Sequence, residues 1–259
     1  MSTRHYRRSI CNRVRACPAK RKMTNLTLTK TGLVESVLRL KPRVAAFDCD
    51  GTLWSGDAGE GFFSWSMAQG MVSEEIEHRA RARYADYKAG NVPEEVMCGE
   101  MVTMYRGLRE EVVQQATDEY FALGIAPGIF GEMRELIESL RAAGTDVWAV
   151  SSSSQWIIRS GMRHFGIPQN RILAAEAVVE NGVVVDRLLR VPSGPGKPDA
   201  LRKALSSPPD CAFGNSLWDR EMLAMSKHPF AINPSPQLKE IAVASAWRMY
   251  QPEANYRGS

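Results

Sequence analysis

The sequence predicts an α/β fold with a Rossmann-like, mainly parallel sheet, helices on both faces of the sheet, and an inserted helical cap. In the second half of the chain, short apolar runs alternate with amphipathic stretches, the pattern of strands and crossover helices. A long helical segment separates the first apolar run from the others. The 259-residue chain is long enough for one such core and a smaller subdomain.

The first elements of the core are a helix over 31–40, which ends before Pro42, and a buried strand over 44–47. Four helices are expected in the inserted segment: Ser73 is the N-cap of the second, residues 91–95 introduce the third and residues 108–113 introduce the fourth. The elements expected after the insertion are, in chain order, helix 129–143, strand 145–150, helix 155–165, strand 171–174, a hairpin over 177–185 turning at Asn181-Gly182, helix 199–205, strand 212–213, helix 219–225, strand 230–232 and helix 237–246.

Composition indicates a reduced, cytoplasmic protein. The five cysteines are an odd set without regular spacing, which argues against a disulfide framework. No apolar run approaches the roughly 20 residues that a membrane helix needs, so no membrane association is expected. The net charge of +4 is mild and much of it is local, so nucleic acid is not an expected partner. The oligomeric state is not predicted.

The basic N-terminus has three interpretations. Eight arginine and lysine residues lie within residues 1–22, and no acidic residue occurs before Glu35. Residues 1–22 resemble an organellar transit peptide, or they bind an acidic partner, or they precede a second start at Met23. We expect residues 1–30 to be a basic, disordered extension, and organellar targeting stays open.

Two aspartates follow the strand over 44–47. Alternate residues of a strand point the same way, so Asp48 and Asp50 are expected to face one crevice beyond its carboxyl end. Two carboxylates so close repel each other unless a cation or a proton lies between them. The alternative is a surface turn, because Asp and Gly are common in turns.

Three further stretches follow in order, each where a strand ends or a helix begins: Val147-Trp148-Ala149-Val150-Ser151-Ser152, Gly194-Pro195-Gly196-Lys197-Pro198-Asp199-Ala200-Leu201 and Cys211-Ala212-Phe213-Gly214-Asn215-Ser216-Leu217-Trp218-Asp219. Together with Phe47-Asp48-Cys49-Asp50-Gly51-Thr52-Leu53 they resemble the four motifs of the haloacid dehalogenase (HAD) superfamily of phosphatases, and most closely its phosphoserine phosphatase-like branch. The resemblance spans about residues 43–247. It implies an α/β core over 31–54 and 125–259, and a helical cap over 55–124 that excludes water and contacts the substrate.

The resemblance also implies a hydrolytic mechanism. Asp48 is the expected nucleophile, which forms an aspartyl-phosphate, and Asp50 is the expected general acid and then base. Lys197 is expected to offset the repulsion between Asp48 and the phosphate. The phosphate-binding residues implied are Cys49, Gly51, Thr52, Ser151, Ser152 and Lys197. In the same serine run, helix capping is the favoured role for Ser153 and Ser154.

The implied cofactor is Mg²⁺, which prefers oxygen ligands. Its expected ligands are Asp48, Asp50, Asn215 and Asp219. Asn215 stands where the family has an aspartate, so we expect an active site that needs a high Mg²⁺ concentration; the alternative is a degenerate, non-catalytic member. No histidines are spaced as metal ligands.

The substrate expected from the resemblance is a small phosphorylated metabolite. Asp57 stands where the branch has a substrate-binding glutamate, and Glu60 follows it. The cap arginine that grips a carboxylate has no clear counterpart: Met101 aligns there, with Arg106 nearby. The missing clamp favours an amine- or hydroxyl-bearing phosphomonoester without an α-carboxylate, such as an amino-alcohol phosphate. A phosphoserine-like compound is the alternative. The other functions weighed are a phosphotransferase and a non-catalytic binding protein.

Aromatic side chains are frequent where the insertion begins. Trp54, Phe62, Phe63 and Trp65 either line the pocket, where they would contact a cationic substrate, or form the core of the cap. Their helical spacing favours the cap core.

Overall fold

A computed structural model describes residues 26–253 of the chain, and all structural statements concern this part. Its seven-stranded sheet has the order β4-β3-β2-β1-β5-β6-β7. All neighbouring strands are parallel except β3 and β4, which are antiparallel, so the predicted mainly parallel α/β fold is confirmed. The strands are β1 (Val44–Phe47), β2 (Asp146–Ser154), β3 (Ile172–Glu180), β4 (Val183–Arg190), β5 (Cys211–Gly214), β6 (His228–Ile232) and β7 (Arg248–Tyr250).

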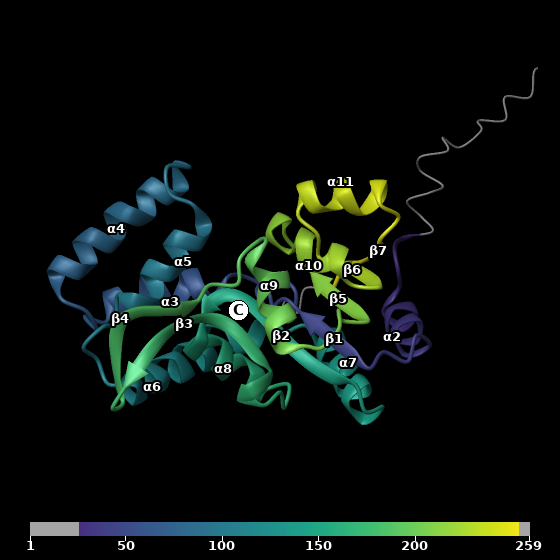
Figure 1. Ribbon diagram of the computed structural model, residues 1–259, viewed down its shortest axis with the longest axis horizontal. Helices are drawn as coiled ribbons and strands as arrows, with labels where there is room; N and C mark the ends of the chain where they lie inside the picture. Colours follow the sequence, from purple (N-terminus) through teal and green to yellow (C-terminus); the bar gives the residue numbers. More distant parts are fainter. Residues whose placement is uncertain (1–25, 254–259) are drawn as a thin grey trace, which may run out of the picture.

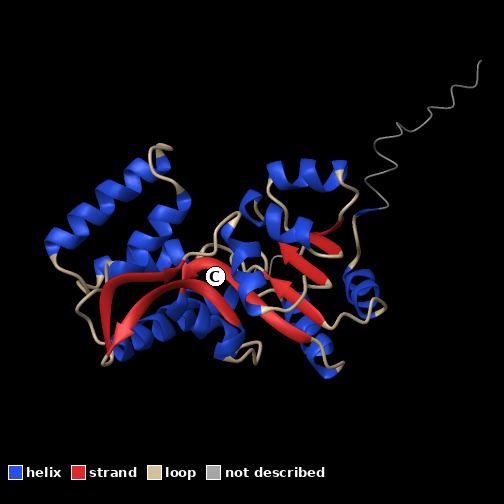
Figure 2. Cartoon of the chain, in the orientation of Figure 1, coloured by secondary structure: helices blue, strands red, loops and turns tan. Residues whose placement is uncertain are grey.

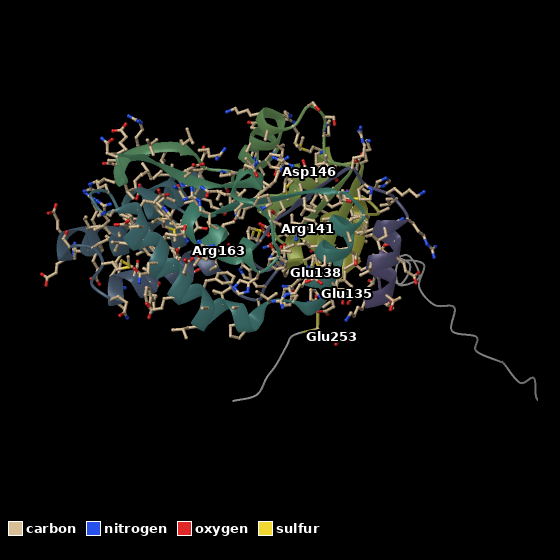
Figure 3. All side chains as sticks on the ribbon, turned by 90° about the horizontal axis from the view of Figure 1, so that it is seen from below. Glu135, Glu138, Arg141, Asp146, Arg163 and Glu253 are labelled. Atoms are coloured by element: carbon tan, nitrogen blue, oxygen red, sulfur yellow. The ribbon has the colours of Figure 1, made fainter. Side chains whose placement is uncertain are left out.

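Helices cover both faces of the sheet (Figure 1). Ala46 packs toward α9, α10 and α11, whereas its neighbours Ala45 and Phe47 pack toward α2, α7 and α8, because alternate strand residues face opposite ways. In the view from below, Glu135, Glu138 and Arg141 mark α7 and Arg163 marks α8 (Figure 3). These helices are α2 (Lys30–Leu38), α7 (Gly131–Ala142), α8 (Gln155–Arg163), α9 (Gly196–Ala204), α10 (Arg220–Met225) and α11 (Pro236–Ala244).

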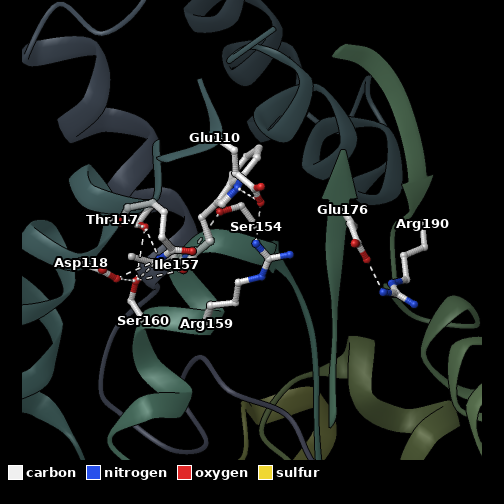
Figure 4. Close-up of polar contacts among 11 residues, drawn as sticks. Glu110, Thr117, Asp118, Ser154, Ile157, Arg159, Ser160, Glu176 and Arg190 are labelled. Carbon is white, nitrogen blue, oxygen red and sulfur yellow. Dashed lines mark hydrogen bonds and ion pairs between the residues drawn. The ribbon is translucent and has the colours of Figure 1, made fainter. Parts of the chain in front are cut away.

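The segment between β1 and α7 forms a second body beside the sheet (Figure 2). It consists of α3 (Ala58–Ala68), α4 (Glu74–Lys88), α5 (Glu94–Thr103), α6 (Glu110–Tyr120) and a π-helical turn (Phe121–Ile125). Ser73 is the N-cap of α4, as predicted. Side chains of α6 bond to the core helix α8: Arg159 Nη1 donates to Glu110 Oε1 at 2.7 Å, and Ser160 Oγ donates to Asp118 Oδ1 at 2.5 Å (Figure 4).

The β3–β4 hairpin joins the sheet to the cap. It turns at Asn181 and Gly182, both with positive φ, as the sequence predicted. At its tip, Gly107 N donates to Val184 O at 2.8 Å and Glu110 N donates to Gly182 O at 2.9 Å. A hairpin that begins in the core sheet therefore ends in backbone contact with the loop between α5 and α6.

The predicted elements differ from the structure most clearly in three places. The strand expected over 171–174 and the hairpin expected over 177–185 are one continuous β3 followed by a longer β4, which together run to Arg190. The three-residue β7 was not predicted, because it is too short to show a period. Leu28 N donates to Met249 O at 2.8 Å and Thr27 pairs with Met249, so the last residues assigned to the disordered extension contact β7.

The predictions for the remainder of the N-terminal extension, including organellar targeting, fall on residues outside the described part of the chain. Cys49, Cys98 and Cys211, the described cysteines, are free thiols. None of the described helices has the length and apolar character that a bilayer crossing requires. The cytoplasmic location stays a prediction.

Candidate active site

The four motif stretches meet at the carboxyl edge of the sheet. β1 lies in the middle, between β2 and β5, where the connections leave in opposite directions and open α/β sheets bind ligands. A cavity of about 530 Å³ lies between these strand ends and the cap helices α3, α4 and α5. Asp48, Asp50, Ser151, Lys197 and Asn215 line it.

A buried lysine lies between two buried carboxylates. Lys197 Nζ is 2.7 Å from Asp48 Oδ1 and 2.5 Å from Asp219 Oδ1. Thr52 Oγ1 donates to the other oxygen of Asp48 at 2.7 Å. Lys197 is 2% exposed, Asp48 6% and Asp219 0%, so solvent screens these charges little. The arrangement fixes one ammonium charge against the carboxylate that the sequence predicts as nucleophile.

The pKa values of Asp48 and Lys197 follow from their burial and from the neighbouring charges. Burial, and then the charge of Asp219, raises the pKa of Asp48 to about 6, although Lys197 and Thr52 oppose the shift. Burial disfavours the charged form of Lys197, but Asp219 and Asp48 outweigh it and raise the pKa of the ammonium. Lys197 therefore stays protonated at neutral pH.

Asp219 has donors on both of its oxygens. Besides Lys197 at Oδ1, the backbone N–H groups of Asn215 and Ser216 donate to Oδ2, each at 2.9 Å, and Ser216 Oγ donates to it at 3.1 Å. These bonds fix the turn after β5 and aim the carboxylate at Lys197. The geometry thus gives Asp219 the role of holding Lys197, and it does not support the predicted role of direct metal ligand.

Asp50 is held by three donors. Its Oδ1 accepts from Trp54 Nε1 at 2.8 Å and from Ala58 N, in the first turn of α3, at 2.7 Å. Its Oδ2 accepts from Ser153 Oγ at 2.6 Å. Burial, and then the charge of Asp57, raises the pKa of Asp50 to about 7, so this carboxyl can gain and lose a proton near neutral pH. Asp48 likewise has a donor on each oxygen, so these bonds do not decide the predicted role of Asp50 as a metal ligand, which stays a prediction.

The four serines at the end of β2, residues 151–154, have different roles. Ser151 is 1% exposed, lines the cavity with Ser152, and its Oγ accepts from Ser153 N at 3.1 Å. Ser154 is the N-cap of α8, with Oγ 3.5 Å from Ile157 N, as predicted. Ser153 was expected to be a spare cap residue, and that prediction was wrong, because its hydroxyl bonds to Asp50.

The predicted phosphate-binding residues also divide. Gly51, Ser151, Ser152 and Lys197 line the cavity, whereas Cys49 and Thr52 are fully buried and lie outside the lining. The hydroxyl of Thr52 bonds to Asp48 instead. Burial and then the nearby carboxylates raise the pKa of the Cys49 thiol, so it stays protonated. The residues of the first group therefore face the cavity where a phosphate would bind, whereas the side chains of Cys49 and Thr52 do not; the phosphate-binding role of each residue stays a prediction.

Two of the predicted metal ligands fit a hard cation. The Asn215 side chain lies against Gly51, so closely that a Cβ there would be 1.9 Å from Asn215 Nδ2. Asp48 and Asn215 thus bring a carboxylate and an amide oxygen to the same end of the cavity, the donor types that Mg²⁺ prefers. Within residues 26–253, no group of three or more His, Cys, Asp or Glu side chains is arranged to hold a metal. Any cation here would keep part of its water shell.

On the cap side of the cavity, Asp57 and Glu60 line the wall, and both make contacts that the sequence did not predict. Asp57, expected to bind the substrate amine, is the N-cap of α3, and its Oδ1 accepts from Glu60 N at 2.8 Å. Glu60 Oε2 instead accepts from Lys88 Nζ at 3.2 Å. Lys88, Tyr84 and Tyr87 line the cavity and were not predicted. Their spacing of i, i+3 and i+4 on α4 is the signal that places them on one helix face.

The four aromatic candidates differ in whether they line the cavity. Trp54 is fully buried, with its ring edge-on to Phe121. Phe62 and Phe63 are nearly buried, and each contributes to the cavity lining. Trp65 packs on Phe62 and does not line the cavity, as expected for the cap core.

The position of the expected carboxylate clamp is apolar. Met101 lines the cavity, whereas Arg106 lies elsewhere, with Nε 3.9 Å from Asp186 Oδ2. The cation that the cap does bring to the cavity is Lys88, on a different helix from Met101.

Residues 45–224 match the family model of the haloacid dehalogenase-like hydrolases. The chain belongs to this family. Within the family it is 30% identical over 220 residues to the Streptomyces azureus "Inhibition of morphological differentiation protein", covering 80% of this chain and 77% of that one. It is 24% identical over 214 residues to a histidinol-phosphatase of Neisseria meningitidis serogroup C, covering 79% and 96%.

Solved structures of HAD proteins share the fold. A Bordetella pertussis protein of unknown function superposes with a TM-score of 0.72 at 21% identity, covering 80% of this chain and 97% of that one. Substrate-bound phosphoserine phosphatase superposes with a TM-score of 0.55 at 18% identity, covering 83% and 95%. The predicted family is confirmed, and the chain is a HAD-type phosphatase. The likeness to phosphoserine phosphatase is one of fold.

Proposed function

We propose that this HAD protein is a Mg²⁺-dependent phosphomonoesterase that forms an aspartyl-phosphate on Asp48. The observation that carries the proposal is the contact of Lys197 Nζ with Asp48 Oδ1, buried at 2.7 Å. A carboxylate and a phosphate ester repel each other, and an ammonium fixed in a site of low dielectric offsets that repulsion as negative charge accumulates. Asp219 keeps the ammonium in place by holding its other side.

The reaction proceeds in two displacements. A carboxylate oxygen of Asp48 attacks phosphorus, the ester P–O bond breaks, and the departing alkoxide takes the proton of Asp50. A water then gives a proton to Asp50 as its oxygen attacks phosphorus, which breaks the Asp48–phosphorus bond and releases phosphate. Asp50 suits both steps, because its pKa of about 7 allows both protonation states near neutral pH.

Magnesium would be held by Asp48 and Asn215, the two expected ligands with oxygens suited to it. The bound ion supplies positive charge that offsets the charge of the phosphate. Because the amide of Asn215 carries no charge, we expect the protein to bind Mg²⁺ more weakly than a site with two carboxylates, so that turnover rises through the millimolar range of Mg²⁺.

The proposed substrate is a small phosphomonoester that also carries an amine. The cavity volume of about 530 Å³ suits a metabolite, and Glu60 and Asp57 add negative charge at its cap side. The names of two similar proteins point the same way, since histidinol phosphate and phosphoserine are both amines.

The test is phosphate release from a panel of amine-bearing and amine-free phosphomonoesters, with Mg²⁺ and with chelator. We expect turnover that needs Mg²⁺ and disappears in Asp48→Asn. Asp199→Asn, an exposed carboxylate on α9, serves as the matched control and should retain turnover. In Asp50→Asn, mass spectrometry should detect the protein carrying one phosphoryl group. Full turnover in Asp48→Asn would refute the mechanism.

A further inference from the structure

The cap wall of the cavity contains a cation cage formed by Glu60, Tyr84 and Tyr87. The ammonium of Lys88 occupies it: Nζ lies 5.0 Å from the centre of the Tyr84 ring, 5.9 Å from that of Tyr87 and 3.2 Å from Glu60 Oε2. All four residues line the same cavity as Asp48. Two ring faces and a carboxylate around one ammonium are the elements with which proteins recognise alkylammonium ligands.

The charge of the surroundings favours a positively charged occupant. Among the described lining residues, Lys88 and Lys197 carry the positive charge, and Lys197 is neutralised by Asp48 and Asp219. Glu94, which is 8% exposed and accepts from Ser193 Oγ at 2.7 Å, adds a further carboxyl to the cap side. A ligand cation in the cage would thus meet carboxyl groups and ring faces with no competing basic side chain apart from Lys88.

Lys88 is a replaceable occupant. It is the last residue of α4, and its side chain is 55% exposed, against 2% for Lys197. Its partner Glu60 is 43% exposed, and ion pairs that solvent reaches contribute little stability. The four-carbon side chain is long enough to release its ammonium into water while the rings stay in place, because Tyr84 also packs on Phe63 and Tyr87.

We propose that the cage is the subsite for the ammonium group of the substrate, and that Lys88 is a built-in competitor which a substrate cation displaces. This inference rests on the proposed function, since it assigns the amine end of the same substrate. It makes Glu60, Tyr84, Tyr87 and Lys88 specificity determinants. A quaternary ammonium fits the cage as well as a primary one, because ring faces attract the charge without needing N–H donors.

The test compares choline phosphate with 3,3-dimethylbutyl phosphate, which has the same shape and no positive charge. In the unaltered protein, kcat/KM should be higher for choline phosphate. Lys88→Met should raise kcat/KM for choline phosphate about threefold to tenfold, which corresponds to removing a competitor of about 0.7–1.4 kcal/mol, and should leave the ester without the ammonium unchanged. Tyr84→Leu and Glu60→Gln should each lower the preference for the cation.

Two control variants test whether the effect comes from the charge at position 88. Lys88→Arg keeps a cation over the rings and should behave as the unaltered protein. Lys203→Met removes the same charge from an exposed position on α9 and should change neither substrate.

Two results would overturn the inference. One is a Lys88→Met protein with an unchanged ratio of kcat/KM for the two esters. The other is a protein that loses activity on a carboxylate-bearing ester such as phosphoserine without gaining on choline phosphate, because Lys88 would then be binding a substrate anion.

Calorimetry separates this inference from the proposed function. Choline phosphate and 3,3-dimethylbutyl phosphate are titrated into Asp48→Asn, with and without Lys88→Met. Tighter binding of choline phosphate alone in the double variant supports the cage even if no ester is hydrolysed. Equal binding of both esters refutes the cage even if hydrolysis is observed.

Discussion

Lys197 and Lys88 line one cavity, the first from the core and the second from the cap. Lys197 is 2% exposed and bonds to two buried carboxylates at 2.5 and 2.7 Å, whereas Lys88 is 55% exposed and bonds to one half-exposed carboxylate at 3.2 Å. A buried charge without its partners is costly, while an exposed charge is solvated wherever it points. The core side of the site is therefore fixed and the cap side is adjustable, which suits one chemistry combined with variable substrate recognition.

The largest effect should come from removing the buried ammonium. Lys197→Met leaves Asp48 and Asp219 buried and facing each other, so we expect phosphate release to fall by about a hundredfold to a thousandfold. The free energy of unfolding should fall by about 3–5 kcal/mol, as when one partner of a buried ion pair is removed. Phosphate release and urea unfolding measure the two effects. Lys203→Met, at the end of the same helix, is the matched control and should change neither.

Retained turnover in Lys197→Met would remove the distinction between the two lysines, since both would then be dispensable for chemistry.

Substitution of the neighbouring residues Ser153 and Ser154 should affect turnover in one case and stability in the other. Ser153→Ala removes one of the three donors to Asp50, and we expect kcat to fall about tenfold with the folded structure intact. Ser154→Ala removes the N-cap of α8, and we expect the free energy of unfolding to fall by about 1 kcal/mol with kcat retained. Steady-state kinetics and chemical unfolding on both variants give the comparison. Equal losses of kcat in the two variants would contradict the assignment of Ser153 to Asp50.

Substitution of Gly161, on α8, tests how tightly the core side of the site is packed. A Cβ at Gly161 would lie 2.8 Å from Trp54 Cη2 and 2.9 Å from a Phe121 ring atom. Gly161→Ala should therefore displace the indole that donates to Asp50, lowering the free energy of unfolding by about 1–3 kcal/mol and slowing turnover. Thermal unfolding and phosphate release check this. Gly131→Ala, a helical glycine with open space at its Cβ, should be neutral or stabilising, and similar losses in both variants would refute the packing argument.

The smallest effect is expected at the opposite end of the sheet. Asp210 accepts from Arg43 N at 2.8 Å, Val44 N at 3.2 Å and Lys227 Nζ at 2.6 Å. Burial raises its pKa, but these bonds outweigh burial and hold the pKa below its usual value of 3.8. Because the folded pKa lies below the unfolded one, the carboxylate stabilises the protein above the unfolded pKa, and this stability is lost as pH falls through the folded pKa.

Asp210→Asn should thus lower the free energy of unfolding by about 1 kcal/mol at neutral pH. The difference from the unaltered protein should shrink toward about pH 3, with activity unchanged. Urea unfolding over this pH range measures it. A difference that does not depend on pH would show that the charge of Asp210 contributes nothing.

Much of the core side of the site was predictable because its residues lie where parallel strands end. The carboxyl ends of parallel strands share one edge, so order along the chain already places Asp48, Ser151 and Asn215 together. Lys197 lies at the start of α9, and its place in the site came from the resemblance to the family. The roles of Asp219 and Ser153 were not predictable, because they depend on which donors the turns present to a carboxylate. The sequence shows residue types there, and the hydrogen bonds follow only from the folded turns.

The cap side was not predictable because it depends on how one body packs on another. The helix positions of Tyr84, Tyr87 and Lys88 follow from sequence, but the face of α4 that meets the cavity does not, since α4 has no fully buried residue to orient it. The capping role of Asp57 was not predicted, because a capping aspartate and a substrate-binding aspartate look alike in sequence. β3 was divided in two because its second half leaves the core, where burial no longer marks a strand.

The β3–β4 hairpin limits how the cap can move. The chain passes between core and cap before α3 and after α6, and the hairpin tip holds the cap at a third place, through backbone bonds to residues 107–110. A lid attached along one side swings freely, but one also tied to a strand of the sheet must bend that strand to open. Opening the cap would therefore have to break these backbone bonds or move the hairpin together with the cap.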